Sequence, residues 1–283
     1  MHRAAATPLD RHALYELCAQ SPARDAALLA AIHGRDPRIL GEDFCGTAAL
    51  SRAWAALSPR HRAIAVDHDP DTLAHAPPAP RVELICADVR RARSPADLLA
   101  VLNYSIGELP DRRSLVAYLR HARDRLRPRG CLVCDLYGGA DAMLTGKVRS
   151  RVRGPRRESI DYTWEQRSAD PLTGRVVNAM HFVVRARGKP PARFTDAFVY
   201  HWRLWSIPEL REAMLESGFD ETEVFNRSIG AIDDHGRCHT RPVQDPADLG
   251  DSFSVYVVGR ATPAARGRRA RRPRLSTRGT TPP

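Results

Sequence analysis

Acidic and small residues gather in a short loop near residue 45, between an apolar run and an alanine-rich run that is typical of a helix. The loop consists of Glu42, Asp43, Phe44, Cys45, Gly46 and Thr47. A further acid, Asp67, follows the next apolar run, 21 residues after Gly46. At that distance from a strand–turn–helix loop, an acid can accept hydrogen bonds from both hydroxyls of a ribose. The pattern therefore predicts a loop that holds a ribose-containing cofactor.

The loop departs from a glycine-rich pattern at two positions, because Phe44 and Ala48 stand where such loops usually carry glycine. No lysine follows Gly46, so the loop is not a phosphate-binding P-loop. Alanine is a mild change, since that position mainly needs a small residue for packing of helix on strand. Phenylalanine cannot adopt a positive φ without cost. We therefore expect either a right-handed turn at Phe44 or a Phe44 ring wedged against the cofactor.

Three more predicted strands end in polar side chains. Asp88 follows the third strand, Asn103 follows the fourth, and Asp135 and Tyr137 end the fifth. In open α/β sheets the ligand lies at the carboxyl ends of the strands. We therefore expect these residues to surround one site together with the loop at Gly46.

The elements that must position these residues alternate along the chain. Residues 10–33 predict two short helices, with Asp10 and Ser21 as N-caps and Gly34 as the stop. Strands and helices alternate from residue 38 to 139, although residues 96–105 also fit a helix on composition alone. A capped helix at 206–218 precedes strands at 221–228 and 252–260. The chain is therefore predicted to be an α/β protein with a doubly wound, mostly parallel, seven-stranded Rossmann-like sheet.

The segment from about 155 to 205 has a different pattern, without helix signals. It predicts three antiparallel strands, the first two joined by a turn at Asp170–Gly174. We expect this small β insert to act as a lid. The predicted organisation is N-terminal helices at 1–36, a cofactor-binding core at 37–150 and 204–260, a substrate lid at 151–203, and a disordered basic tail at 261–283.

The ordered strand ends resemble those of the class I S-adenosylmethionine-dependent methyltransferases. The first motif of that family, an acid followed by Gly-x-Gly-x-Gly, is similar to EDFCGTA, and the next two are similar to AVDHDP and CADVR. The fourth motif is similar to LLAVLNYSIGEL. The resemblance covers roughly residues 10–140 and 200–260. Its fourth motif and the β insert look most like glycine and amino-sugar N-methyltransferases.

The resemblance implies S-adenosyl-L-methionine as the cofactor and gives roles to particular residues. Glu42 and the backbone near Gly46 would meet its methionine part, which Asn103 would also line. Asp67 would bind the ribose, Asp88 would accept from the adenine amine, and His68 would stack beside the adenine. Tyr15 would close over the cofactor. The other expected cofactor-binding residues are Phe44, Cys45, Thr47 and Val89.

The methyl acceptor is expected to lie under the lid. Along its third strand Phe198, Tyr200 and Trp202 share one face, while Val199, His201 and Arg203 share the other. Packing of the lid onto the core is the alternative role for the aromatic residues. The candidates for steering or deprotonating the acceptor are Tyr137, His181, Tyr200 and His201.

These patterns predict an enzyme that transfers a methyl group in line from S-adenosylmethionine to nitrogen or oxygen of a small molecule. Two other functions remain open. The chain could be a non-catalytic module of the same fold that binds nucleic acid, or an RNA or protein methyltransferase. The family's Asn-Pro-Pro-Tyr signature of base and glutamine modification is absent, because Asn103, Tyr104 and Ser105 stand in its place.

Charge and composition limit the partners. The net charge is +11, but residues 260–283 carry eight arginines and no acid, which leaves 11 − 8 = +3 for the rest. We expect a solvated tail, with weak nucleic-acid contact as the alternative. The histidines show no pair at metal-ligand spacing, so no metal is expected. No apolar run approaches the roughly 20 residues of a membrane span, and the six irregularly spaced cysteines indicate a reduced, cytoplasmic protein.

Overall fold

The computed structural model describes residues 9–227, 231–232 and 238–262 of the 283. The arginine-rich tail from residue 263 on, with the nucleic-acid contact considered for it, lies outside the described residues.

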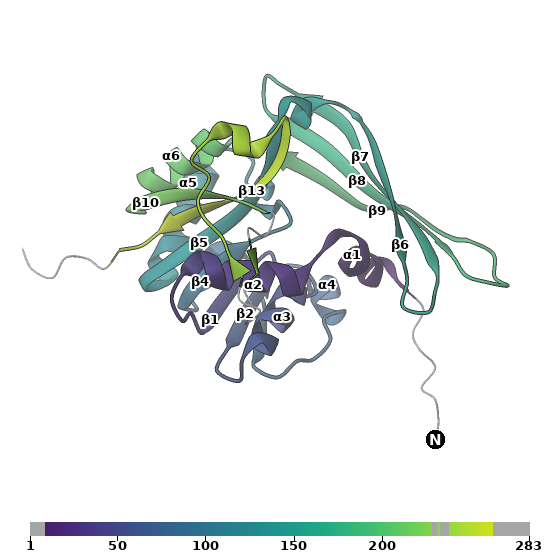
Figure 1. Ribbon diagram of the computed structural model, residues 1–283, viewed down its shortest axis with the longest axis horizontal. Coiled ribbons are helices and arrows are strands. Elements are labelled where there is room, and N and C mark those ends of the chain that lie inside the picture. The colour runs from purple at the N-terminus through teal and green to yellow at the C-terminus, as the bar shows by residue number, and fades with distance from the viewer. Residues whose placement is uncertain (1–8, 228–230, 233–237, 263–283) are drawn as a thin grey trace, which may run out of the picture.

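Seven strands form one sheet in the order β10-β13-β5-β4-β1-β2-β3 (Figure 1). The strands are β1 Ile39–Asp43, β2 Arg62–Asp67, β3 Val82–Cys86, β4 Ala96–Val101, β5 Leu126–Gly139, β10 Glu221–Asn226 and β13 Ser252–Arg260. β13 runs antiparallel to β5 and β10, and the other neighbours are parallel. The predicted Rossmann-like sheet is confirmed, and residues 96–101 form a strand rather than a helix.

Helices cover both faces of this sheet. They are α1 Arg11–Ala19, α2 Pro22–His33, α3 Ala49–Leu57, α4 Pro70–Ala74, α5 Arg112–Arg125 and α6 Ile207–Glu216. Short 3₁₀ helices are η1 Val89–Arg91, η2 Ser105–Glu108, η3 Ala140–Met143 and η4 Pro246–Leu249. A two-stranded ladder joins β11 Ala231–Ile232 to β12 Cys238–His239.

The core lies between the sheet and these helices, and the strands divide it by alternation. Leu98 and Ala100 of β4 are buried in the cluster with α2 and α3, whereas Leu99 and Val101 are buried in the cluster with α5 and α6. Successive side chains of a strand point to opposite faces. Each fully buried aliphatic side chain stabilises the fold by about 1.5–3 kcal/mol. A sheet buried on both faces holds its strand ends in fixed positions.

The caps predicted for the helices are mostly present. The Asp10 carboxylate accepts a hydrogen bond from Ala13 N at 2.8 Å and starts α1. Ser206 and Glu209 form a capping box at the start of α6. Gly34 ends α2 with a φ of 71°. Ser21 precedes α2 but makes no side-chain cap, so there Pro22 supplies the start signal.

The insert is a four-stranded antiparallel sheet, which we call the lid. Its strands are β6 Gly146–Arg153, β7 Ser159–Asp170, β8 Arg175–Arg185 and β9 Ala192–Arg203, in that order. The sequence predicted three strands and missed β6, an exposed edge strand with lysine and arginine on one face and only Val148 and Val152 as apolar side chains on the other. The predicted β7–β8 turn is present, with Gly174 N donating to Asp170 O at 2.7 Å.

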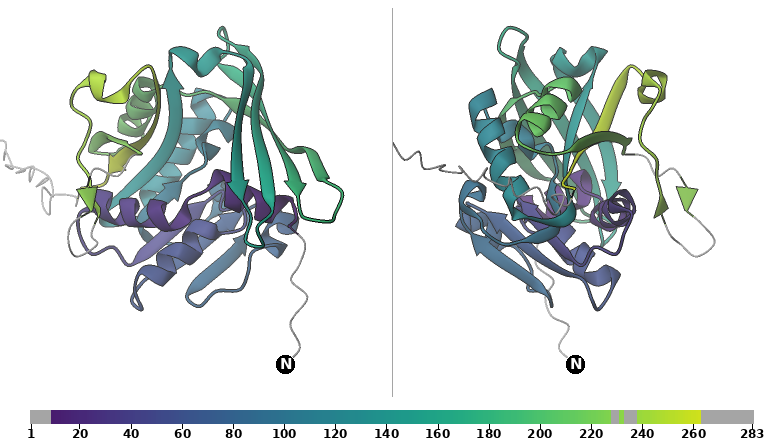
Figure 2. Two further views of the ribbon diagram at one scale, coloured as in Figure 1. Left: turned by 45° about the vertical axis from the view of Figure 1, so that its right-hand side comes forward. Right: turned by 90° about the vertical axis from the view of Figure 1, so that its left-hand side faces the viewer.

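The lid stands beside the seven-stranded sheet, and helix α1 passes close to the strands of the lid (Figure 2). Its inner face packs on α1, since Leu14 is buried in one cluster with Ile160, Met180 and Phe182. Its outer face carries ion pairs such as Lys147–Glu165 at 3.0 Å. The lid therefore has an apolar side that faces the core and a charged side that faces solvent.

Candidate functional site

The loop after β1 keeps a left-handed backbone although two of its glycines are missing. Phe44, Gly46 and Ala48 have φ values of 58°, 55° and 56°. Of the two alternatives expected for Phe44, the right-handed turn is therefore wrong. Left-handed backbone costs a residue other than glycine about 1–2 kcal/mol. The Phe44 ring packs against Tyr118, with ring centroids 6.1 Å apart, and such contacts hold the strained turn in place.

Asp67, at the end of β2, holds this loop in place through hydrogen bonds to the backbone. One carboxylate oxygen accepts from Gly46 N at 2.8 Å and the other accepts from Asp69 N at 3.0 Å. Only 13% of the side chain is exposed. The acid therefore fixes both the Gly46 turn and the start of the next turn, while one edge of it faces a cavity.

A cavity of about 550 Å³ lies over this loop at the carboxyl ends of the strands, and we call it the cofactor-side cavity. Eight of the residues predicted to bind the cofactor line it: Tyr15, Phe44, Cys45, Gly46, Thr47, Asp67, His68 and Asn103. Other lining residues include Gln20, Thr72, Ser105 and Glu108, which the sequence did not single out. Gln20 is notable because its Oε1 atom is buried without a hydrogen-bond partner among the described residues.

The N-terminal helix is held against this cavity by Glu16. Its carboxylate accepts from Thr47 Oγ1 and from the Arg52 guanidinium, the latter at 2.5 Å. Tyr15, on the same helix, lines the cavity from above the loop. The structure therefore places α1 as part of the site, as the resemblance implied for Tyr15.

The structure does not bring Glu42, Asp88 or Val89 to the cavity lining. Glu42 is buried and accepts from both the N–H and the hydroxyl of Ser51, at 2.9 and 2.6 Å, and burial raises its pKa to about 7. Asp88 bonds to the Arg90 side chain, which lowers its pKa to about 2. Val89 is buried in the core cluster. The position of these residues at strand ends therefore did not predict that their side chains point away from the cavity.

The loop after β4 has a second left-handed turn, at two consecutive residues. Asn103 and Tyr104 have φ values of 59° and 63°. Both backbone N–H groups donate to the carboxylate of Asp135 on β5, at 3.0 and 2.7 Å. Strained backbone of this kind persists only where the surroundings hold it, and it is typical of functional sites. Asp135 therefore supports the conformation that presents Asn103 to the cavity.

A buried charge network extends from Asp135 to the N-terminal helices. Arg227 donates to Asp135 at 3.0 Å and to Asp25 on α2 at 3.3 Å. Tyr256 also donates to Asp25, at 2.7 Å. Burial raises the pKa of Asp135 to about 6 despite the opposing charge of Arg227. The sequence marked Asp135 as a strand end but gave no signal for Arg227, whose two carboxylate partners lie on β5 and α2.

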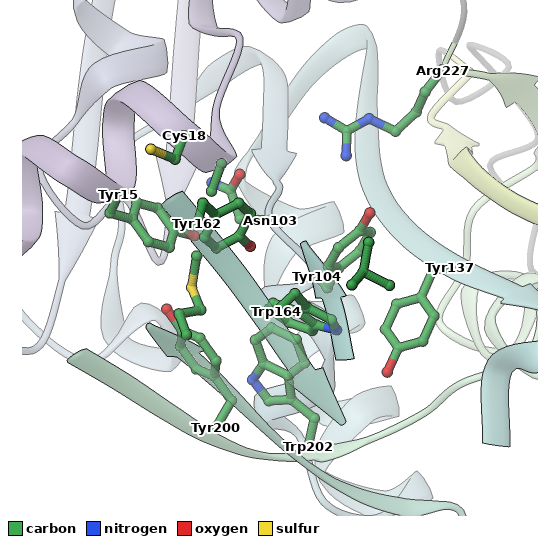
Figure 3. Close-up of a pocket in the computed structure, with 13 residues that line it drawn as sticks. Tyr15, Cys18, Asn103, Tyr104, Tyr137, Tyr162, Trp164, Tyr200, Trp202 and Arg227 are labelled. Atoms are coloured by element: carbon green, nitrogen blue, oxygen red, sulfur yellow. The ribbon is translucent and has the colours of Figure 1, made fainter. Parts of the chain in front are cut away.

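A second cavity, of about 340 Å³, lies between the lid and the loop after β4 (Figure 3), and we call it the acceptor-side cavity. Its rings come from Tyr15, Tyr104, Tyr137, Tyr162, Trp164, Tyr200 and Trp202. Met180, Cys18, Asn103 and Arg227 are among its other lining residues. Tyr200 and Trp202 stack with ring centroids 4.4 Å apart. Most of the wall is therefore aromatic.

The two cavities meet at four side chains that line both of them. These are Tyr15, Asn103, Tyr200 and Trp202, which we call the seam. The Tyr15 and Tyr200 side chains are hydrogen-bonded to each other. The seam therefore joins the N-terminal helix, the loop after β4 and the last strand of the lid.

The tyrosines of the acceptor-side cavity act as neutral groups. Burial raises the pKa of Tyr137 and of Tyr200 above the ordinary value. Tyr137 donates to Gln166 at 3.1 Å and accepts from Asn178 at 3.3 Å. These hydroxyls can therefore orient a ligand but are poorly suited to remove a proton from it.

The structure does not bring His181 or His201 to either cavity. His181 lies on the outer face of the lid, 3.0 Å from Glu165, where its Nδ1 accepts from Asp196 N. His201 is exposed on the face of β9 opposite to Tyr200. Tyr137 and Tyr200 are the two acceptor-site candidates that line the acceptor-side cavity. Alternation along β9 separates Tyr200 from its neighbour His201.

Among the described residues no group of three or more histidine, cysteine, aspartate or glutamate side chains is arranged to hold a metal ion. Within the same ranges, no helix has both the length and the apolar character needed to cross a membrane.

No protein-family model matches the chain, and no curated protein matches it. Solved structures do. DesVI of Streptomyces venezuelae is 19% identical with a TM-score of 0.66, covering 91% of this chain and 100% of that one. CalS10 of Micromonospora echinaspora, described as an amino pentose methyltransferase with bound SAM, is 18% identical (TM-score 0.63; 92% and 100% covered).

The sugar N-methyltransferase KedS8 of a Streptoalloteichus species is 17% identical with a TM-score of 0.64, over 92% of this chain and 97% of that one. Identities this low establish the fold and nothing finer. The chain has the fold of S-adenosylmethionine-dependent methyltransferases, which confirms the fold that the strand-end motifs predicted.

Proposed function

We propose that the chain is an S-adenosylmethionine-dependent methyltransferase that acts on a small molecule, with an amine nitrogen as the acceptor atom. The observation that carries this proposal is the seam, where a cavity over the Gly46 loop meets an aromatic cavity under the lid. Methyl transfer needs a donor and an acceptor held in line with bulk water excluded. Two cavities that share four lining side chains are consistent with that arrangement.

The cofactor-side cavity fits S-adenosylmethionine in size and in chemistry. Its volume of about 550 Å³ lies in the range of small-molecule sites, roughly 300–1,000 Å³. Asp67 would accept from the ribose hydroxyls, and the unpartnered Oε1 of Gln20 would accept from an ammonium group. When bound, this cofactor supplies a methyl group on a positively charged sulfur, and an acceptor that takes the methyl also takes over the positive charge.

The walls of the acceptor-side cavity favour nitrogen over oxygen. Aromatic faces attract cations, by about 0.5–2 kcal/mol each, so a nitrogen that becomes positively charged is stabilised there. An alcohol would need a base, and the lining tyrosines have raised pKa values. A neutral amine already has a lone pair to donate. The acceptors named for CalS10 and KedS8, an amino pentose and a sugar amine, are consistent with this choice.

The first experiment measures cofactor binding by calorimetry. We expect micromolar affinity for S-adenosylmethionine, weakened in Asp67→Ala by roughly 2 kcal/mol, the scale of buried hydroxyls that lose a charged partner. The matched control is Asp36→Ala, whose carboxylate is 57% exposed beside Arg38 on the surface. Absence of binding by the intact protein would defeat the proposed function, whereas equal affinity of Asp67→Ala would defeat only the ribose assignment.

The second experiment identifies the acceptor atom. Methyl transfer from labelled S-adenosylmethionine would be measured with a panel of amino sugars and with the same sugars carrying hydroxyl groups in place of the amines. We expect transfer to amines only, rising with pH as the amine loses its proton. Preferential methylation of the hydroxyl compounds would overturn the choice of nitrogen and leave the cofactor assignment intact.

A further inference from the structure

Glu108, the last residue of η2, lies at the seam and has no role in the site as described so far. Its Oε1 accepts a hydrogen bond from the indole Nε1 of Trp202 at 2.7 Å. The preceding residue must be glycine for this contact, because a Cβ on Gly107 would lie 2.9 Å from Trp202 Cβ and Cγ. The close approach of η2 to β9 therefore fixes the carboxylate beside Trp202.

Glu108 lies in one cavity and contacts a residue that also lines the other. It lines the cofactor-side cavity and its bonding partner Trp202 lines both cavities. Tyr200, another seam residue, is close enough for the Glu108 charge to add to the rise in its pKa, after the larger effect of burial. The Glu108 carboxylate therefore lies next to two side chains, Tyr200 and Trp202, that line both cavities.

The other two carboxylates of the cofactor-side cavity are engaged in turns. Asp67 accepts from Gly46 N and Asp69 N, and Asp69 accepts from Asp71 N and Thr72 Oγ1. Glu108 accepts from Trp202 through one oxygen, and among the described residues no donor is bonded to its other oxygen. Its second oxygen is therefore available to a ligand.

We propose that Glu108 binds the positive charge at the point of methyl transfer and so stabilises the acceptor nitrogen as it becomes cationic. This inference rests on the proposed function. The acceptor nitrogen forms a bond to the methyl carbon, the bond from that carbon to sulfur breaks with its electron pair going to sulfur, and the charge moves to nitrogen. The nitrogen then loses a proton to the Glu108 carboxylate, which returns it to water. A fixed carboxylate near the acceptor nitrogen stabilises the transition state, in which that nitrogen becomes positively charged, more than it stabilises the neutral amine before transfer.

The test uses two ligands that differ at the transfer point and needs no acceptor. Sinefungin carries a protonated amine where the cofactor carries its methyl-bearing sulfur, whereas S-adenosylhomocysteine has a neutral sulfur there. Both Kd values would be measured by calorimetry for the full chain and for Glu108→Gln. We expect the full chain to prefer sinefungin, and the variant to lose about tenfold of that preference, the scale of a lost hydrogen bond to a charged group.

The two affinities separate charge binding from a packing role. If Glu108 only positions Trp202, both ligands weaken together and the preference stays, which would overturn the inference. Glu216→Gln serves as the control and should change neither affinity, because Glu216 is an exposed residue of α6 that pairs with Arg112 of α5. Failure of the full chain to bind either ligand would defeat the proposed function itself, so the two failures are distinguishable.

Discussion

The two cavities that meet at the seam are built in opposite ways. The cofactor-side cavity is shaped by backbone, with left-handed residues at Phe44, Gly46 and Ala48 and an acid that bonds to backbone N–H groups. The acceptor-side cavity is shaped by aromatic side chains from the lid, from α1, from the loop after β4 and from β5. A backbone-built cavity depends on buried supports, whereas a side-chain-built cavity can change its ligand by single substitutions.

The loop after β4 belongs to both cavities, and its support should show the largest effect. Asp135→Ala removes the acceptor for the N–H groups of Asn103 and Tyr104 and leaves Arg227 without one of its two partners. Breaking a buried ion pair costs about 3–5 kcal/mol. We expect a loss of that size in the free energy of unfolding, measured by urea denaturation.

The control for Asp135 is a carboxylate of the lid. Asp161→Ala breaks an ion pair with Arg151 on the outer face, where the pair is exposed to water. Exposed pairs contribute little to stability, so this variant should unfold almost like the parent chain. Equal costs for the two substitutions would contradict the view that the backbone-built side depends on buried support.

The next prediction separates the two cavities by function. Trp164 lines the acceptor-side cavity and not the cofactor-side cavity, whereas His68 has the reverse distribution. Trp164→Leu should lower kcat/KM for an amine acceptor by roughly 10²-fold, since misalignment of reactants is costly. It should leave the Kd for S-adenosylmethionine within about twofold, as expected for a remote site.

His68→Ala completes this comparison. Its side chain is 78% exposed beside Asp67, so its loss should weaken S-adenosylmethionine by only about threefold, in the range of surface substitutions. The variant should keep its kcat at saturating cofactor. A Trp164→Leu protein that lost cofactor affinity as strongly as acceptor turnover would show that the cavities are not separate sites.

The backbone-built side was largely predictable because its signals are local. The spacing of Gly46 and Asp67, the alternation of strands with helices, and the Asp170–Gly174 turn each follow from short-range rules. The sequence also identified Tyr200 and Trp202 as one face of a strand. Alternation alone, however, could not say that this face rather than that of His201 points inward.

The rest could not be predicted because it depends on partners far apart in the chain. Arg227 is bonded to Asp135 and Asp25, which are 92 and 202 residues away in sequence. Asparagine and tyrosine do not favour left-handed backbone strongly enough to predict two consecutive left-handed residues at Asn103 and Tyr104. Glu42 was expected to contact the cofactor because of its position in the motif, but its side chain is buried in the core, where it accepts a hydrogen bond from Ser51.

Glu42 gives a pH-dependent test of that inward orientation. Burial raises its pKa from 4.5 to about 7, so the folded protein binds a proton more tightly than the unfolded chain. The resulting stability is present in full below pH 4.5 and is lost as the pH rises through about 7. Replacement by glutamine removes this titration and keeps an oxygen for Ser51.

The parent chain should therefore lose free energy of unfolding, on the order of 3 kcal/mol, relative to Glu42→Gln between pH 4.5 and 8. Urea denaturation at each pH measures the difference between the two proteins. Asp135, whose pKa burial raises to about 6, titrates in both proteins and cancels from that difference. Parallel pH profiles would mean that Glu42 faces solvent or the cofactor instead of the core.

The smallest predicted effect concerns Ala48, where the loop lacks its last glycine. Ala48 is fully buried and starts α3 with φ 56° and ψ 36°. Ala48→Gly relieves the left-handed strain, about 1–2 kcal/mol. It also destabilises the fold by about 0.4–1 kcal/mol, because glycine raises the conformational entropy of the unfolded chain. The loss of a buried methyl group costs about 0.8 kcal/mol more. These changes nearly cancel, so we expect the free energy of unfolding to stay within about 0.5 kcal/mol of the parent value.

Ala48→Val is the matched contrast, because a β-branched residue suits neither this backbone nor the space around it. It should destabilise the protein by at least about 2 kcal/mol and weaken S-adenosylmethionine through the adjoining Gly46 turn. If Ala48→Gly instead stabilised the chain by more than 1 kcal/mol, the alanine would lower the stability of the folded protein through its left-handed backbone. If both variants matched the parent, the left-handed turn at Ala48 would not be what shapes that cavity.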